Sequence, residues 1–136
     1  MTKEPCRDGI LNAMSRRIEQ FKDECRFWEE SMSYLLLENL HMKTRLGAVI
    51  PYIDKDAMDE VEHYQNLFLT KDMAMALYRK DIFEHRQLLA RATADGDIAQ
   101  HIKAGQNRLR TDIRRLEQDC SNLKFDFNAY LESVLG

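Results

Sequence analysis

Histidine and glutamate are the first residues of this 136-residue chain to consider for chemistry, because helical proteins often bind metal ions with them. Glu60 and His63 form a Glu-x-x-His motif, which di-iron carboxylate proteins carry on two helices, together with a glutamate from each of two others. His63 and His85 fall on one predicted helix about 33 Å apart, too far to share an ion. His41 falls on an outward face. We expect no metal and no cofactor, and a metal- or ligand-binding bundle around His63 and His85 is an alternative function.

Three cysteines are the next candidates, as nucleophiles, zinc ligands or disulfide partners. Cys6, Cys25 and Cys120 form neither an even set nor a CxxC pair, so we expect neither a disulfide framework nor a thiolate zinc site. Cys25 and Cys120 fall at positions where helices pack, and a thiol there acts as a small apolar core residue. Because no nucleophile stands beside a plausible base and no glycine-rich phosphate loop occurs, we expect no enzymatic activity.

A basic cluster in the last third of the chain could bind an anion. Its members are Lys103, Arg108, Arg110, Arg114 and Arg115, and Asp112 is the only acidic residue in that stretch. A solvated helix face is the simplest interpretation. A second alternative function is binding of an anionic partner, a nucleic acid or an acidic protein, through the Arg108–Arg115 end. The formal net charge of −3 argues against a general nucleic-acid binder, so nucleic acid is the less expected partner.

These side chains must be positioned by helices, and the first predicted helix sets the pattern. Apolar residues recur every three and four positions from Leu11 to Val49, as in a coiled-coil seam. The apolar seam positions are Leu11, Met14, Ile18, Phe21, Cys25, Trp28, Met32, Leu35, Met42, Leu46 and Val49. The exception is Asn39. We expect its amide to set the register or the number of partners, and to form a hydrogen bond across helices, because a buried unpaired amide costs about 1–3 kcal/mol.

The same spacing continues in two further segments. The predicted inward positions of the second helix are Val61, Phe68, Met75, Ile82 and Leu89, and those of the third are Ile102, Leu109, Leu116, Leu123 and Tyr130. Gln106 interrupts the third seam. The run from Met73 to Tyr78 could be an adaptable binding surface, but at helical spacing we expect it to belong to the core.

Chain breakers separate the first two helices. The first is predicted at about 9–50, where Gly47 can serve as a left-handed cap and Pro51 prevents smooth continuation. Asp54 is a credible N-cap for the second helix, predicted at about 55–93.

The third helix is predicted at about 97–135, after Gly96 as a C-terminal cap and Asp97 as an N-cap. Turns this short allow only antiparallel neighbours. The sequence therefore predicts one all-α domain, residues 1–136, folded as an elongated antiparallel three-helix bundle or coiled coil of helices about 40 residues long. In this layout Cys25 lies level with residue 110, and Asn39 lies level with Asn66 on the second helix and Lys124 on the third.

Two surface features of the predicted rod bear on its partners: an uneven distribution of charge, and apolar residues outside the seam that favour self-association. Residues 1–31 with 75–115 form one end of the rod with 15 basic and 12 acidic residues, whereas the remainder has 5 and 11. This asymmetry, +3 against −6, can steer an anionic partner to one end or favour antiparallel pairing of rods, and it dictates neither. In the first helix, Leu36 and Leu37 extend the apolar surface beyond the seam. The predicted oligomer interface consists of Leu35, Leu36, Leu37 and Asn39, and we expect a homodimer.

The functional expectation is a non-enzymatic interaction or scaffold protein. Its specific role is undetermined; we expect it to self-associate, and a different protein partner is kept open. No run of eighteen apolar residues occurs, and residues 1–9 are not followed by the apolar core of a signal peptide. We therefore expect a cytoplasmic protein with no membrane partner.

Overall fold

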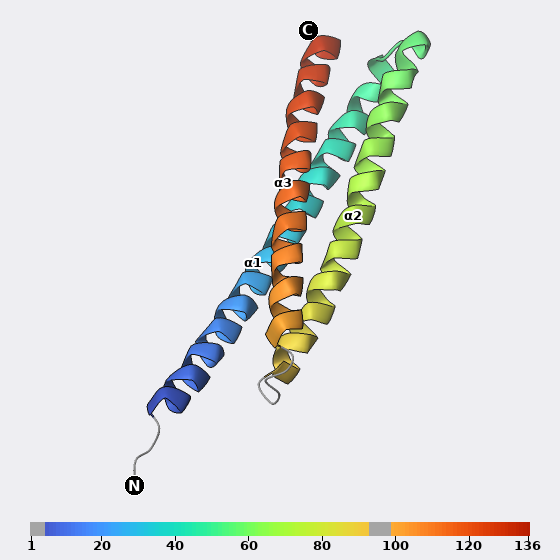
Figure 1. Cartoon of the computed structure of the whole chain (residues 1–136). Helices are drawn as coiled ribbons and strands as arrows, with labels where there is room; N and C mark the ends of the chain where they lie inside the picture. Colours follow the sequence, from blue (N-terminus) through green and yellow to red (C-terminus); the bar gives the residue numbers. More distant parts are fainter. Residues whose placement is uncertain (1–4, 93–98) are drawn as a thin grey trace.

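The chain folds into three long helices that lie side by side (Figure 1). The computed structural model describes residues 5–92 and 99–136, with side chains from residue 13, Met14 and Ala99 excepted. The helices are α1 (Pro5–Val49), α2 (Met58–Arg91) and α3 (Ala99–Leu135), and the described residues contain no strand. The α2 helix runs antiparallel to α1 and α3, and all three pairs are in contact. The predicted all-α three-helix bundle is confirmed.

Two short 3-10 turns connect α1 to α2. They are η1 (Ile50–Tyr52), with Pro51 in its first turn, and η2 (Lys55–Ala57), preceded by Asp54 in extended conformation. The backbone N–H of Ile53 donates to Ile50 O (3.1 Å), and that of Ala57 donates to Asp54 O (2.9 Å). Because these turns satisfy the backbone, α2 begins at Met58, and the Asp54 side chain makes no capping hydrogen bond.

The predicted role of Gly47 is wrong. Gly47 lies inside α1, and no glycine among the described residues has a positive φ. The helix continues to Val49 and is ended by the geometry of Pro51. Gly96 and Asp97, predicted as the caps of the second connection, lie outside the described residues.

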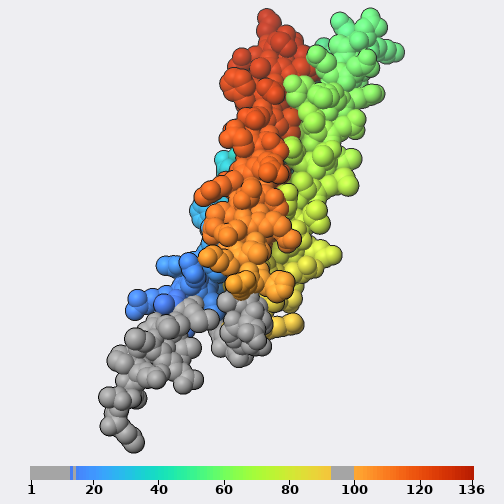
Figure 2. Space-filling view, in the orientation of Figure 1, coloured from blue at the N-terminus to red at the C-terminus, as the bar shows by residue number. Residues whose placement is uncertain are grey.

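The helices differ in length. At 1.5 Å per residue, the 45 residues of α1 span about 67 Å, the 34 of α2 about 51 Å and the 37 of α3 about 56 Å. Figure 1 shows that the N-terminal part of α1 diverges from α2 and α3 toward the end where these two helices are connected. In the space-filling view, α2 and α3 lie against each other, with α1 visible behind α3 (Figure 2).

The interior forms two apolar clusters. The first core cluster lies toward the α2–α3 connection and consists of Cys25, Trp28, Met32, Met75, Ile82, Leu89, Ala92, Ile102, Leu109, Ile113, Leu116 and Cys120. The second core cluster lies toward the α1–α2 connection and consists of Met42, Leu46, Val49, Val61, Phe68, Leu123, Phe127, Tyr130 and Leu131. Asn39 lies at the level where they meet, between Met32 and Met42 on α1. Every inward position predicted for the second and third helices is buried.

Four aromatic rings fill the centre of the second core cluster. The ring of Phe127 packs edge-on against Phe68 (centroids 5.0 Å apart) and Tyr64 (5.4 Å). Tyr130 lies 4.8 Å from Tyr64 on the same side of the cluster. Edge-to-face aromatic pairs add about 0.5–1.5 kcal/mol beyond the burial of their surface. This cluster therefore holds the ends of α2 and α3 together.

Candidate functional site

A buried polar network crosses all three helices within the first core cluster. Its centre is Gln106 on α3, which is fully buried. The Gln106 amide nitrogen donates to the backbone O of Phe21 (3.2 Å) and to Glu24 Oε1 (2.7 Å), both on α1. Its Oε1 therefore faces His85 on α2, 2.6 Å from Nε2. Because an amide oxygen only accepts, His85 carries its proton on Nε2.

An ion pair closes the network on the α1 side. Arg110 donates from Nε to Glu24 Oε2 (2.7 Å) and from Nη2 to Glu24 Oε1 (2.6 Å), a bidentate arrangement. Burial raises the pKa of Glu24, but the hydrogen bonds from Arg110 and Gln106 and the charges of Arg110 and Arg114 outweigh it and hold that pKa below its ordinary value. Glu24 therefore stays ionised and orients the Gln106 amide.

The His85 ring lies against the backbone of α3. A Cβ added to Gly105 would lie 3.0 Å from Cε1 and 3.1 Å from Nδ1 of His85, so a larger residue there would displace the ring. Burial lowers the pKa of His85; the Gln106 hydrogen bond opposes this, and the charge of Arg108 adds to it. The imidazole is therefore neutral at pH 7, and its role is to fix the register of α2 against α3.

Acidification from pH 7.5 to 5.5 is expected to destabilise the bundle through His85. An unfolded histidine takes up its proton near pH 6.5, whereas the folded state lowers the pKa of His85. Between these pKa values the unfolded chain binds more protons. The stability contributed by neutral His85 is therefore present above about pH 6.5 and is lost as the pH falls toward the folded pKa. Urea-unfolding midpoints at several pH values measure this loss.

The matched control is an exposed histidine on the same helix. His85→Gln is expected to flatten the change in midpoint between pH 7.5 and 5.5, whereas His63→Gln is expected to leave it intact. Equal pH dependence in both variants would contradict the assignment to His85.

The structure does not bring the candidate metal ligands together. His63 is exposed and contacts the edge of Tyr64, while His85 is buried 22 residues further along α2. Glu38 and His41 repeat the Glu-x-x-His spacing on α1, but Glu38 binds Lys124 (2.8 Å) and His41 is exposed. Within the described part of the chain, no three His, Cys, Asp or Glu side chains converge on one point.

The two described cysteines are buried free thiols. Cys25 and Cys120 both belong to the first core cluster, and burial raises the pKa of each to about 11. The side chain of Cys6 lies outside the described residues. A thiol with so high a pKa holds little thiolate at neutral pH.

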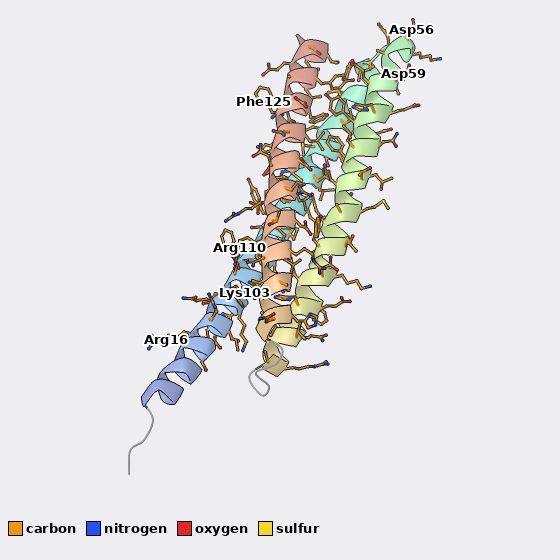
Figure 3. The ribbon with its side chains drawn as sticks, in the orientation of Figure 1. Arg16, Asp56, Asp59, Lys103, Arg110 and Phe125 are labelled. Carbon is orange, nitrogen blue, oxygen red and sulfur yellow. The ribbon has the colours of Figure 1, made fainter. Side chains whose placement is uncertain are left out.

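The predicted basic cluster is divided between two faces of α3. Lys103, Arg110 and Arg114 are spaced by seven and four residues and share the side of α3 on which Arg110 meets Glu24 of α1, whereas Arg108 and Arg115 are exposed on another side. Figure 3 shows Lys103 and Arg110 on the same side of α3. Arg110 is neutralised by Glu24. The charge of Arg108 acts on His85.

Asn39 is almost completely buried and is hydrogen-bonded across helices, as predicted. Its Nδ2 donates to the backbone O of Phe68 (2.9 Å) and to Asp72 Oδ1 (2.6 Å), both on α2. Asp72 also binds Lys43 one turn further along α1. The amide therefore fixes the level of α1 against α2. Leu35, one turn before Asn39, is half-buried against the first core cluster.

An exposed apolar surface runs along the outer side of the α1–α2 pair. On this outer side, Lys43 of α1 and Asp72 of α2 form an ion pair, so the faces that carry these two residues lie next to each other. Leu40 and Leu36 precede Lys43 by three and seven residues, and Leu69 precedes Asp72 by three, so helical spacing puts them on this side. Met73 follows Leu69 by four residues and continues the surface outward on α2. Leu37 continues this surface outward. We define the α1–α2 strip as Leu36, Leu37, Leu40, Leu69 and Met73.

Two of the four predicted interface residues, Leu36 and Leu37, therefore lie in the strip. The sequence analysis missed Leu40, Leu69 and Met73.

The predicted placement of the whole run from Met73 to Tyr78 in the core is wrong. Met75 is 1% exposed, but Met73 is 67% and Leu77 57% exposed. Two residues turn a helix by about 200°, so Met73 and Met75 point to opposite sides. That rotation was the signal that could have found Met73.

Neither a family model, nor a curated protein, nor a solved structure matches this chain. Among the described helices, none has a stretch that is long and apolar enough to cross a membrane.

Proposed function

We propose that this protein is a non-enzymatic helical interaction protein that pairs with a second copy of itself through the α1–α2 strip. One observation carries the proposal. Leu37, Leu40, Leu69 and Met73 are each more than half exposed, yet they lie together within about two helical turns. Contiguous exposed apolar surface of this kind marks sites of protein association.

An antiparallel arrangement of the two copies fits the charges. Asp56 and Asp59 lie at the α1–α2 end of the rod, while Arg16 and Lys103 lie toward the opposite end (Figure 3). A twofold axis through the strip places the acidic end of one copy beside the basic end of the other. Complementary ends steer association and fix the orientation of the partners.

The chemistry of the interior supports a non-enzymatic role. The thiols of Cys25 and Cys120 have pKa values raised to about 11, and the His85 imidazole is committed to Gln106. These groups serve packing and register. The proposal includes the cytoplasmic location expected from the sequence.

Replacing Leu37 and Leu40 together by glutamate is expected to raise the Kd of self-association at least tenfold. Four glutamates in the paired strips would be desolvated and would repel one another. Both side chains are about half exposed in the single chain, so the helix content should be unchanged. Sedimentation equilibrium at tens of micromolar measures the Kd, and circular dichroism checks the fold.

The control makes the same charge change on another helix. Phe125→Glu with Leu135→Glu alters two exposed apolar residues of α3 and is expected to leave the Kd unchanged. A wild-type monomer at tens of micromolar, or an equal loss in both double variants, would contradict pairing through the strip.

A further inference from the structure

A groove lies on a different side of α1, between α1 and α3. The α1 helix packs most extensively against α2 and least against α3. The groove between α1 and α3 has a volume of about 450 Å³. Its apolar lining consists of Leu35, Met42, Met75, Cys120 and Leu123. The α1 residues along it run from Glu30 to Met42, about 18 Å at 1.5 Å per residue.

The lining of the groove contains a buried acceptor without a donor. Asn39 lines the groove and is 1% exposed, and its Oδ1 has no hydrogen-bond partner among the described residues. The orientation of the amide is fixed, because Phe68 O and Asp72 Oδ1 both accept and must face Nδ2. Oδ1 therefore points away from α2, and neighbouring side chains cover it, since almost none of its surface is exposed. A buried acceptor left unpaired costs about 1–3 kcal/mol, so a donor in the groove that displaces those side chains and reaches Oδ1 would be bound favourably.

The polar rim of the groove is acidic. Glu30 and Glu117 lie on opposite sides of it, on α1 and α3, and neither forms an ion pair with any described residue. Glu38 is the third carboxylate of the lining, and Lys124, its single cation, binds it at 2.8 Å. The net charge of the lining is therefore −2, and the two unpaired carboxylates, Glu30 and Glu117, lie on its opposite edges. A complementary occupant carries cations on both of its flanks.

We propose that the α1–α3 groove binds an amphipathic helix of a partner protein, with lysine or arginine on both flanks of its apolar stripe. An apolar helix face can lie in such a groove through anchors at i, i+4, i+7 and i+11, which span about 17 Å. One amide or hydroxyl side chain within the stripe would donate to Asn39 Oδ1. The bound helix would complete a four-helix arrangement with α1, α2 and α3.

This site is separate from the α1–α2 strip. Tyr34 and Glu38 border the groove, whereas Leu40, two residues or about 200° further round α1 than Glu38, faces the α2 side. Leu37 lies on the solvent side of α1 between them and does not line the groove. A dimer formed through the strip leaves the groove open. The helix-binding proposal therefore does not rest on the proposed self-association.

The test uses a fluorescein-labelled 18-residue helical peptide with four leucine anchors, one glutamine within the stripe and lysines on both flanks. Fluorescence anisotropy with the full chain is expected to show saturable binding. A peptide with glutamates in place of the lysines is expected to bind at least tenfold more weakly. Replacing the central glutamine with leucine is expected to weaken binding severalfold, because Asn39 Oδ1 then lacks its donor.

Variants of the protein locate the site. Glu30→Gln with Glu117→Gln is expected to weaken binding of the lysine peptide at least fivefold, and Ser121→Trp, which fills the groove from α3, is expected to abolish it. Leu37→Glu with Leu40→Glu is the matched control and is expected to keep full binding. Circular dichroism confirms that each variant is folded.

Equal binding of the lysine and glutamate peptides would overturn the proposal, as would full binding by Ser121→Trp. Loss of binding in the Leu37→Glu, Leu40→Glu variant would also overturn it, because the peptide would then occupy the strip. Failure of the wild-type chain to dimerise would leave the groove result unaffected, so the two proposals fail separately.

Discussion

Replacing Phe127 with alanine is expected to lower the free energy of unfolding by about 3–5 kcal/mol. The side chain is fully buried and packs against Phe68, Tyr64 and Tyr130, and the Arg45 guanidinium lies 5.8 Å from its ring centroid. Alanine would remove the shared partner of three rings and leave a cavity that long, regular helices cannot close. Thermal unfolding at a fixed protein concentration should show Tm lowered by about 10 °C or more.

Phe125 provides a control two residues away on the same helix. It is 76% exposed and points away from the bundle (Figure 3). Phe125→Ala is expected to change the stability by no more than about 0.5 kcal/mol. Similar losses in the two variants would show that the cluster of rings does not hold α2 to α3.

The inward faces and the levels of the helices could be predicted from the sequence because the spacing of apolar residues and the short first turn determine them together. The predicted level of Cys25 with residue 110 is confirmed by the Glu24–Arg110 ion pair, and that of Asn39 with Lys124 by the Glu38–Lys124 pair. Both follow from counting residues away from a turn. The predicted level of Asn39 with Asn66 is wrong by about one helical turn, because Asn39 bonds Phe68 and Asp72 on α2. The hydrogen bond of Asn39 followed from the cost of burying an unpaired amide.

The division of surfaces around α1 could not be predicted in this way. A heptad pattern gives the inward direction of a helix, but it does not say which of two neighbours lies on each flank. Leu35 and Leu36 are adjacent in sequence, yet Leu35 lines the α1–α3 groove and Leu36 lies on the α2 side. The pairing of Gln106 with His85 could not be predicted for the same reason, because a seam position shows that a residue points inward but not which residue it contacts.

Which helix packs on each flank of α1 also determines whether a charged side chain is paired or left exposed. Arg110 looked like a member of a basic patch, but α1 brings Glu24 within 2.6 Å of it. Its charge is therefore used inside the molecule. Glu30 and Glu117 gave no signal in the sequence, and they matter because the weaker packing of α1 on α3 leaves them on the two edges of a groove.

Replacing Gln106 with leucine is expected to cost about 2–4 kcal/mol at pH 7.5. Leucine would occupy similar space but would leave the Nε2–H of His85 without an acceptor and remove one donor from Glu24. Each unpaired buried group costs about 1–3 kcal/mol. Urea unfolding measures the loss. The control is Gln118→Leu on the exposed side of the same helix, where Gln118 binds Asn122, and its effect should stay within about 0.5 kcal/mol.

Adding His85→Leu to Gln106→Leu is expected to restore most of the lost stability. With both partners apolar, no buried donor is left without an acceptor, and Glu24 keeps both hydrogen bonds from Arg110. The double variant should therefore lie within about 1 kcal/mol of wild type, while each single variant is clearly less stable. The sum of the two single losses minus the loss in the double variant measures the coupling between α2 and α3 through this pair, at least about 2 kcal/mol. Strictly additive losses would mean that His85 and Gln106 are buried independently, and the pH dependence assigned to His85 would then need another explanation.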